Sequence, residues 1–137
     1  MLHTDTKQAD RLPLWLTIII ILETLPMFIG PVIALTRPAM MGGPEADSIN
    51  QAAYIYAARN VAVGIALIVA FVLKNKHMLF ALILVRLLTD IVDLPTLLYF
   101  GLASNQILVI SIFVFLYYIP AVIALRFLWE SSRRAAQ

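Results

Sequence analysis

The sequence predicts an all-α, polytopic membrane protein: a single domain over residues 1–137 that crosses the bilayer as an antiparallel bundle of four helices. Hydrophobic residues make up 62% of the chain and charged residues 13%, whereas a soluble domain is nearer half apolar and a quarter charged. Four apolar stretches each have about the 20 residues that a helix needs to cross the hydrocarbon core. In lipid such stretches must be helical, because every backbone polar group has to be satisfied within its own segment.

The first span is expected over about residues 12–35. It is too long for the apolar region of a signal peptide, which has roughly 7–15 residues, and it carries Glu23. We therefore interpret it as a retained transmembrane helix. Pro26 and Pro31 stand in its outer half, where prolines free backbone carbonyls that could line a cavity or only bend the helix.

The second span is expected over about residues 52–73 and the third over about 78–100. The tight basic turn between them, residues 74–77, makes the two helices antiparallel neighbours. Gly64 in the second span is expected to let another helix approach closely. The fourth span follows a short turn and is expected over about 106–128, which returns the chain to the side from which it started.

Basic residues are divided unevenly between the two sides of the predicted bundle. Only Arg37 lies on the side of the first connection. Seven lie on the side of the termini: Lys7, Arg11, Lys74, Lys76, Arg126, Arg133 and Arg134. Because an excess of Lys and Arg marks the cytoplasmic side of a membrane protein, we expect the N- and C-termini to be cytoplasmic.

The composition excludes several kinds of chemistry. A formal net charge of +2 is small for a nucleic-acid-binding protein, which usually carries a basic stripe. The absence of cysteine excludes disulfides, thiolate catalysis and cysteine metal sites. His3 and His77 are the only imidazoles, neither lies in a cluster with metal-ligand spacing, and no phosphate loop or dinucleotide fingerprint is present. We expect no metal and no cofactor.

Five ionisable residues lie deep inside the apolar stretches: Glu23, Arg59, Arg86, Asp90 and Asp93. A charge at that depth is costly, usually faces the bundle interior or a wet cavity, and commonly marks function. Arg59 and Asp93 each lie seven residues from the outer end of their predicted spans. That distance is roughly 10 Å at a rise of about 1.5 Å per residue, so these two side chains could meet.

The third span arranges its charges on one stripe, because Arg86, Asp90 and Asp93 follow helical spacing. Arg86 and Asp90 can pair along the helix, and Glu23 is expected at the same depth as Arg86. The prediction is therefore two tiers: Arg59 with Asp93, and Arg86 with Glu23 and Asp90. Four nearby polar residues could contact a bound substrate: Tyr56, Asn60, Thr89 and Tyr117.

The charge balance of this cluster points to chemistry. Three acids face two arginines, and arginine keeps its proton. If all five groups were ionised, the cluster would hold one net negative charge. We expect one acid to stay protonated, or the surplus charge to meet water or a ligand cation. A carboxyl group in that position could act as a general acid or base, whereas the plainer alternative is that the ion pairs only fix helix packing.

The segment from Arg59 to Leu67, with the basic turn and the aspartates that follow it, resembles the second and third helices of the DoxX-like group of small four-helix membrane proteins, many of them bacterial. In that group an arginine, an adjacent acidic or amide residue and a glycine five positions after the arginine open the second helix. Here these are Arg59, Asn60, which stands where an aspartate is common, and Gly64. The similarity covers about residues 54–95 and implies a four-helix bundle in a bacterial cytoplasmic (inner) membrane. Because the group includes quinone-linked oxidoreductase subunits and receptor-assembly chaperones, the resemblance implies no single activity.

Three functions fit these features. The first is a pocket in the bilayer that binds a lipophilic small molecule. If it is an enzyme, it would catalyse cofactor-free acid–base chemistry (an isomerase, a cyclase or an epoxide-opening hydrolase), with Asp90 or Asp93 as the base and the arginines as orienting electrophiles. The second is a non-catalytic accessory or scaffold subunit of a membrane complex. The third is a proton-coupled small transporter acting as an oligomer. A homo-oligomer and a membrane partner protein both stay open, whereas a nucleic-acid partner does not.

Overall fold

The computed structural model describes residues 12–38, 51–99 and 105–135, and every regular element in these residues is helical. This confirms the all-α class. Most of the predicted connection between the first two spans lies outside the described residues. The elements in chain order are α1 (Leu14–Thr24), α2 (Pro26–Thr36), α4 (Gln51–Val72), α5 (Lys76–Tyr99), α6 (Gln106–Ile112), the π-helix η1 (Phe113–Tyr118) and α7 (Ile119–Ala135).

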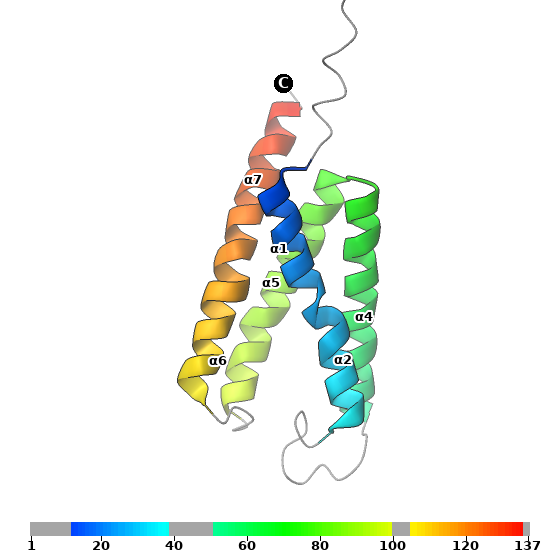
Figure 1. Ribbon diagram of the computed structural model, residues 1–137, viewed down its shortest axis with the longest axis vertical. Helices are drawn as coiled ribbons and strands as arrows, with labels where there is room; N and C mark the ends of the chain where they lie inside the picture. The colour runs from blue at the N-terminus through cyan, green and yellow to red at the C-terminus, as the bar shows by residue number, and fades with distance from the viewer. Residues whose placement is uncertain (1–11, 39–50, 100–104, 136–137) are drawn as a thin grey trace, which may run out of the picture.

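These elements form four long rods that run side by side (Figure 1), with α1 and α2 in one rod and α6, η1 and α7 in another. Three rods are long and apolar enough to cross a bilayer: Leu14–Thr36, Gln51–Val72 and Gln106–Arg134. They mark the chain as an integral membrane protein. The fourth rod, α5, is equally long, but it is less apolar because Arg86, Asp90 and Asp93 all lie along its length.

The predicted boundaries of the first three spans agree with these helices to within a few residues. The fourth helix differs, because it continues to Ala135, well beyond the predicted end at residue 128. Its extra turns are held by polar contacts: Arg126 Nε donates to Glu130 Oε1 at 3.0 Å, and the guanidinium of Arg133 lies 5.1 Å from the ring centre of Trp129. Basic residues in a last turn also interact favourably with the helix dipole, so the polar end extends the helix.

Two irregularities follow from proline. Pro26 has no N–H, so the carbonyl of Leu22 loses its usual helical donor, and the chain turns at Leu25 between α1 and α2. The backbone N–H groups of both Phe28 and Ile29 then donate to the Leu25 carbonyl, at 3.2 Å each. In the last rod, the wider turns of η1 come just before Pro120, which likewise cannot donate to the preceding turn.

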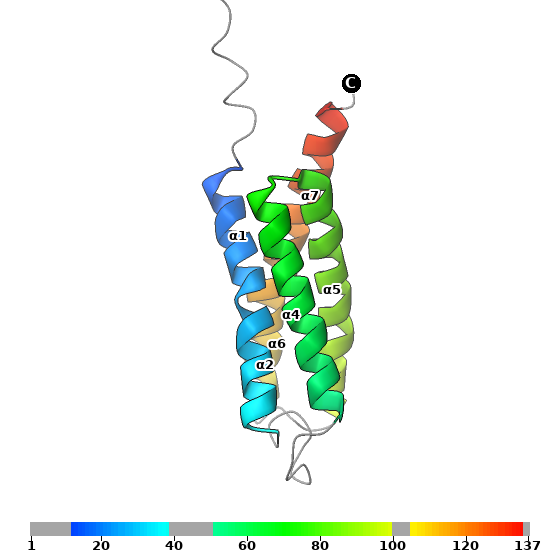
Figure 2. The ribbon, with the colours of Figure 1, turned by 90° about the vertical axis from the view of Figure 1, so that its right-hand side faces the viewer.

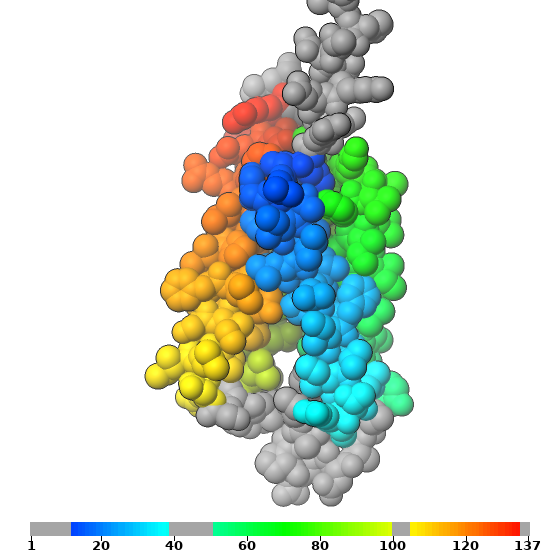
Figure 3. Space-filling model, in the orientation of Figure 1, coloured from blue at the N-terminus to red at the C-terminus, as the bar shows by residue number. Residues whose placement is uncertain are grey.

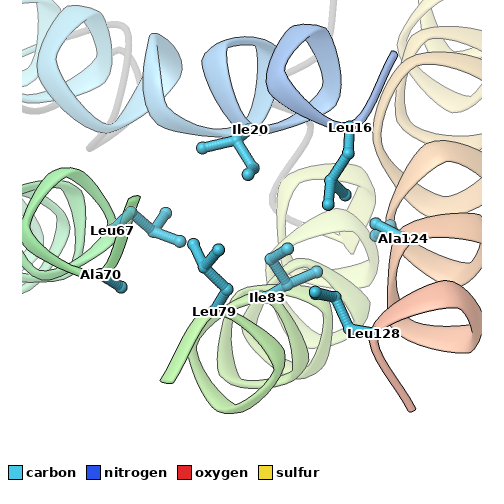
Figure 4. Close-up of a cluster of buried hydrophobic side chains, with 9 residues drawn as sticks. Leu16, Ile20, Leu67, Ala70, Leu79, Ile83, Ala124 and Leu128 are labelled. Carbon is cyan, nitrogen blue, oxygen red and sulfur yellow. The ribbon is translucent and has the colours of Figure 1, made fainter. Parts of the chain in front are cut away.

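The apolar core fills the half of the bundle nearer the two termini. It takes its side chains from four helices: Leu16 and Ile20 from α1, Leu67 and Ala70 from α4, Leu79 and Ile83 from α5, and Ala121, Ala124 and Leu128 from α7. These side chains point into one shared interior (Figure 4). All are 3% exposed or less, so this half of the molecule is closely packed.

At the end of the bundle where α2 ends and α4 begins, the four rods separate into two pairs. There α2 packs against α4, while the rod that contains α6 lies on the side of α5 (Figures 1 and 2). The space-filling view shows the surface hollowed between α2 and α6, with part of α5 behind the hollow (Figure 3). Arg59 of α4 and Asp90 and Asp93 of α5 lie toward this end, so the bundle has an apolar half and a polar half.

Gly64 sets the spacing between α2 and α4. A Cβ atom built on it would lie 2.9 Å from Met27 Cβ and 3.0 Å from the ring of Phe28. No side chain fits at that distance without moving the neighbouring helix. The prediction that Gly64 permits a close helix contact is therefore confirmed.

Candidate functional site

The upper pair of the predicted cluster is formed. Arg59 on α4 and Asp93 on α5 meet because the basic turn makes these helices antiparallel neighbours. Arg59 Nη2 donates to Asp93 Oδ1 at 3.4 Å and to Oδ2 at 3.3 Å. The side chains are 45% and 27% exposed. These contacts are longer than the roughly 2.7–2.9 Å typical of charge-assisted hydrogen bonds, so Arg59 holds Asp93 less firmly than a close pair would.

The lower pair lies within α5 and is buried. Arg86 Nη1 contacts Asp90 Oδ1, one helical turn away, and both side chains are almost fully enclosed. A pair taken out of water is stable only while both members are present, because removal of either leaves an uncompensated charge. The hydroxyl of Tyr118 on η1 also donates to the backbone carbonyl of Asp90, at 2.8 Å. This bond joins the rod formed by α6, η1 and α7 to α5 at the level of the Arg86–Asp90 pair.

Glu23 lies beside this pair but is not bonded to it. The charges of Arg86 and Asp90 act on Glu23, which places it in the predicted lower tier. The residue is only 1% exposed, and neither of its carboxyl oxygens has a hydrogen-bond partner in the described part of the chain. The same is true of Arg86 Nε. The lower tier thus contains an acceptor group and a donor that both lack partners.

The four polar residues predicted to contact a substrate differ in what they contact. Asn60 is buried, but its Nδ2 donates to the backbone carbonyl of Tyr56 at 2.8 Å, and Thr89 Oγ1 donates to the carbonyl of Arg86 at 2.7 Å. Both therefore bond within their own helices. Tyr117 stacks edge-on to Phe113, with ring centres 5.7 Å apart. Only Tyr56 reaches the cavity described next.

A cavity of about 190 Å³ opens beside the two ion pairs. Its wall combines charged, aromatic and apolar groups from α4, α5 and η1: Tyr56, Arg86, Asp90, Asp93, Thr96, Leu97 and Phe113. Of the five predicted catalytic residues, the structure brings Arg86, Asp90 and Asp93 into this wall. Arg59 and Glu23 are not in the wall, although Arg59 contacts Asp93 and the charge of Arg86 acts on Glu23.

Sequence reasoning missed three residues of this wall. Thr96 and Leu97 follow Asp93 by three and four positions, which places them on the same face of α5, so helical spacing could have identified them. Phe113 could not have been identified in this way, because the π-helix changes the spacing of side chains along its rod.

The arrangement offers proton donors and acceptors inside an apolar enclosure. The two carboxylates and the phenol can bind or transfer a proton at the polar end of a guest. The guanidinium of Arg86 can donate hydrogen bonds to that end but keeps its proton, and Leu97 and Phe113 can contact the apolar part. In the described ranges, no three His, Cys, Asp or Glu side chains are grouped so that they could hold a metal ion.

Comparison with protein-family models, with curated proteins and with solved structures gives no match to this chain. The similarity to the DoxX-like group stays a prediction that depends on the residues quoted for it. The function therefore has to be argued from the geometry of the site.

Gly30 on α2 positions Tyr56, and its replacement by alanine is expected to disturb the cavity more than the fold. The added Cβ would lie 2.7 Å from the Tyr56 hydroxyl oxygen, and the end of a tyrosine side chain can swing aside. We expect Gly30→Ala to change the free energy of unfolding by less than about 1 kcal/mol, and to weaken ligand binding as much as Tyr56→Phe does. The two variants would be compared by their free energy of unfolding and by their affinity for a ring-sized small molecule, para-fluorobenzyl alcohol. A full loss of folding in Gly30→Ala would contradict this role.

Proposed function

We propose that this integral membrane protein binds a lipophilic small molecule in the cavity between α4, α5 and η1. The supporting observation is a cavity of about 190 Å³ that has Arg86, Asp90 and Asp93 in its wall. Charges in a membrane domain usually mark a substrate or ion pathway. A scaffold would be expected to have a closed core, whereas here Arg86, Asp90 and Asp93 border an open cavity, which favours a ligand site.

The size of the cavity limits what it can hold. An apolar cavity of about 150 Å³ accommodates benzene, whereas whole drug-sized ligands occupy about 300–1,000 Å³. The cavity therefore suits a single ring or a short polar end group. The rest of a longer molecule would lie in the hollow between α2 and α6 (Figure 3) and extend into lipid.

The membrane arrangement belongs to the same proposal. We infer that α5 also crosses the membrane, which gives four spans in all. Its residues Arg86, Asp90 and Asp93 are paired with Arg59 or with one another, which lowers the cost of placing them in lipid. The excess of basic residues on the side of the termini supports cytoplasmic N- and C-termini. The resemblance to the DoxX-like group supports a bacterial cytoplasmic membrane as the location.

The chemistry that this wall supports is proton transfer without a cofactor. Asp90 is buried against Arg86, whereas Asp93 is partly exposed and loosely held by Arg59. Two acids in such different surroundings can hold different protonation states. One could then act as the base and the other as the acid in an isomerisation, a cyclisation or an epoxide opening, with the arginines orienting the reacting oxygen.

The test uses a ring-sized probe, para-fluorobenzyl alcohol, with the purified protein in detergent and fluorine NMR as the readout. We expect Asp93→Asn to weaken binding about tenfold, because a hydrogen bond to a charged group contributes about 1.5–3 kcal/mol and tenfold is about 1.4 kcal/mol. The fold should survive, because the Arg59–Asp93 contacts are long and asparagine keeps an oxygen that can accept a hydrogen bond from Arg59.

Two further variants make the result specific. Glu130→Gln breaks a surface ion pair far along α7 and should bind the probe as the wild type does. Leu97→Trp should fill the cavity and abolish binding. If the wild type binds no more probe than empty micelles do, or if Leu97→Trp binds as well as the wild type, the proposed function is wrong.

A further inference from the structure

Glu23 is a buried acid that the proposed cavity does not use. It lies at the end of α1, two residues before the turn at Leu25, and is 1% exposed. Neither carboxyl oxygen receives a hydrogen bond from the described residues. An ionised carboxylate enclosed in this way, without a donor from the described residues, is so unfavourable that such groups normally become neutral instead.

Both arginines of the predicted cluster already pair with other acids. Arg59 pairs with Asp93, and Arg86 pairs with Asp90. Each pair is neutral as a unit, so no positive charge remains for a third acid. Glu23 is therefore the acid of the predicted cluster that is left without an arginine partner.

We propose that Glu23 is a proton-binding site in the middle of the bundle, and that Arg86 determines whether it holds its proton. In the resting protein Glu23 is a neutral carboxylic acid, because the positive charge of Arg86 is already paired with Asp90. This site is distinct from the cavity and does not require the proposed ligand.

A proton fits the site better than a metal cation does. No group of three potential ligands surrounds Glu23 in the described ranges, and metal sites built from carboxylates need several oxygen ligands. The guanidinium of Arg86 also acts on Glu23 and would repel a second cation. A proton needs only the carboxyl group itself.

Arg86 links Glu23 to the cavity. It stands in the cavity wall, its charge acts on Glu23, and its Nε–H is buried without a hydrogen-bond partner in the described residues. The other groups that face Glu23 are Asp90 on α5 and Tyr117 on η1. If Asp90 loses its charge, Arg86 is free to pair with Glu23, whose proton then leaves for solvent as a carboxylate forms.

Infrared spectroscopy can detect the proton directly. A protonated carboxyl has a carbonyl stretch that a carboxylate lacks, and this band moves to lower frequency in heavy water. The full chain would be purified in a detergent without ester groups and measured at neutral pH. Spectra of the wild type would be compared with those of Glu23→Gln, Asp90→Asn and Asp93→Asn, after circular dichroism has shown each to be helical.

The band should be present in the wild type, absent in Glu23→Gln, absent in Asp90→Asn and unchanged in Asp93→Asn. A band that persists in Glu23→Gln, or no band in the wild type, overturns the proposal. A band that persists in Asp90→Asn overturns the role of Arg86. An unfolded Asp90→Asn protein counts against it as well, because Arg86 would then have failed to find Glu23 as its new partner.

Isotope labelling gives a second measurement that needs no substitution. The chain has three glutamates, Glu23, Glu45 and Glu130, and Glu130 is bonded to Arg126 at the surface. If the proposal holds, carbon-13 glutamate shifts the band of the wild-type protein, and carbon-13 aspartate leaves it in place. The opposite pattern assigns the proton to an aspartate and excludes Glu23. Failure of the probe-binding experiment would leave both results unchanged, so the two proposals can be judged separately.

Discussion

Arg86→Met is expected to destabilise the protein more than loss of any other single charge. Arg86 is buried, and among residues 12–38, 51–99 and 105–135 its one ion pair is with Asp90, so its removal leaves a carboxylate enclosed in the bundle without a counter-ion. Breaking a buried pair by removing one partner costs about 3–5 kcal/mol, which is a large share of the total stability of about 5–15 kcal/mol. Unfolding in mixed micelles, followed by circular dichroism, measures the loss.

The matched control is Arg126→Met, which makes the same change at an exposed pair with Glu130. Exposed pairs contribute about 0–1 kcal/mol, so this variant should unfold close to the wild type. The double variant Arg86→Met with Asp90→Leu replaces both charges by apolar groups, and such replacements are often neutral or stabilising. We expect it to recover most of the lost stability. A double variant as unstable as Arg86→Met would show that the charge left on Asp90 is not the cause.

Gly64→Leu is expected to have the second-largest effect on stability. The first atom of the new side chain would already lie 2.9 Å from Met27 Cβ, which is attached directly to the backbone of α2. The whole of α2 would have to move, and overpacking of this kind typically costs about 1–3 kcal/mol. Because α2 also places Gly30 against Tyr56, the displacement should reach the cavity wall and weaken probe binding.

Ala62→Leu is the control for this substitution, since Ala62 is an exposed residue of the same helix. Exposed substitutions usually change stability by no more than about 0.5 kcal/mol. The same unfolding titration compares the two variants. Equal stability of Gly64→Leu and Ala62→Leu would mean that α2 and α4 do not meet at Gly64.

Much of the site could be predicted because helical geometry is regular. The spacing of Arg86, Asp90 and Asp93 defines a stripe, and a short turn makes α4 and α5 neighbours, which together bring Arg59 to Asp93. The glycine at position 64 likewise indicated close packing. These inferences need only the repeat of a helix and the cost of a charge in lipid.

The remaining features depend on contacts between rods, which spacing along one helix does not determine. The sequence placed Glu23 with Arg86, but its two oxygens make no hydrogen bond to the part of the chain that the structure describes, and Arg86 pairs with Asp90 on its own helix instead. The π-helix that presents Phe113 and Tyr118 has no simple sequence signal. The predicted end of the last helix, residue 128, was too early. Polar residues end the apolar stretch that can cross a membrane, but the helix itself continues through them.

The unequal packing of the two halves has a consequence for motion. Local opening requires little free energy where few apolar contacts must break, and approaches the cost of global unfolding in a dense core. The end that contains Leu16, Leu79 and Leu128 should therefore behave as one rigid cooperative unit. The end around Asp93 and Leu97 should open at a lower cost in free energy, which would let the proposed ligand enter from the side without global unfolding of the bundle.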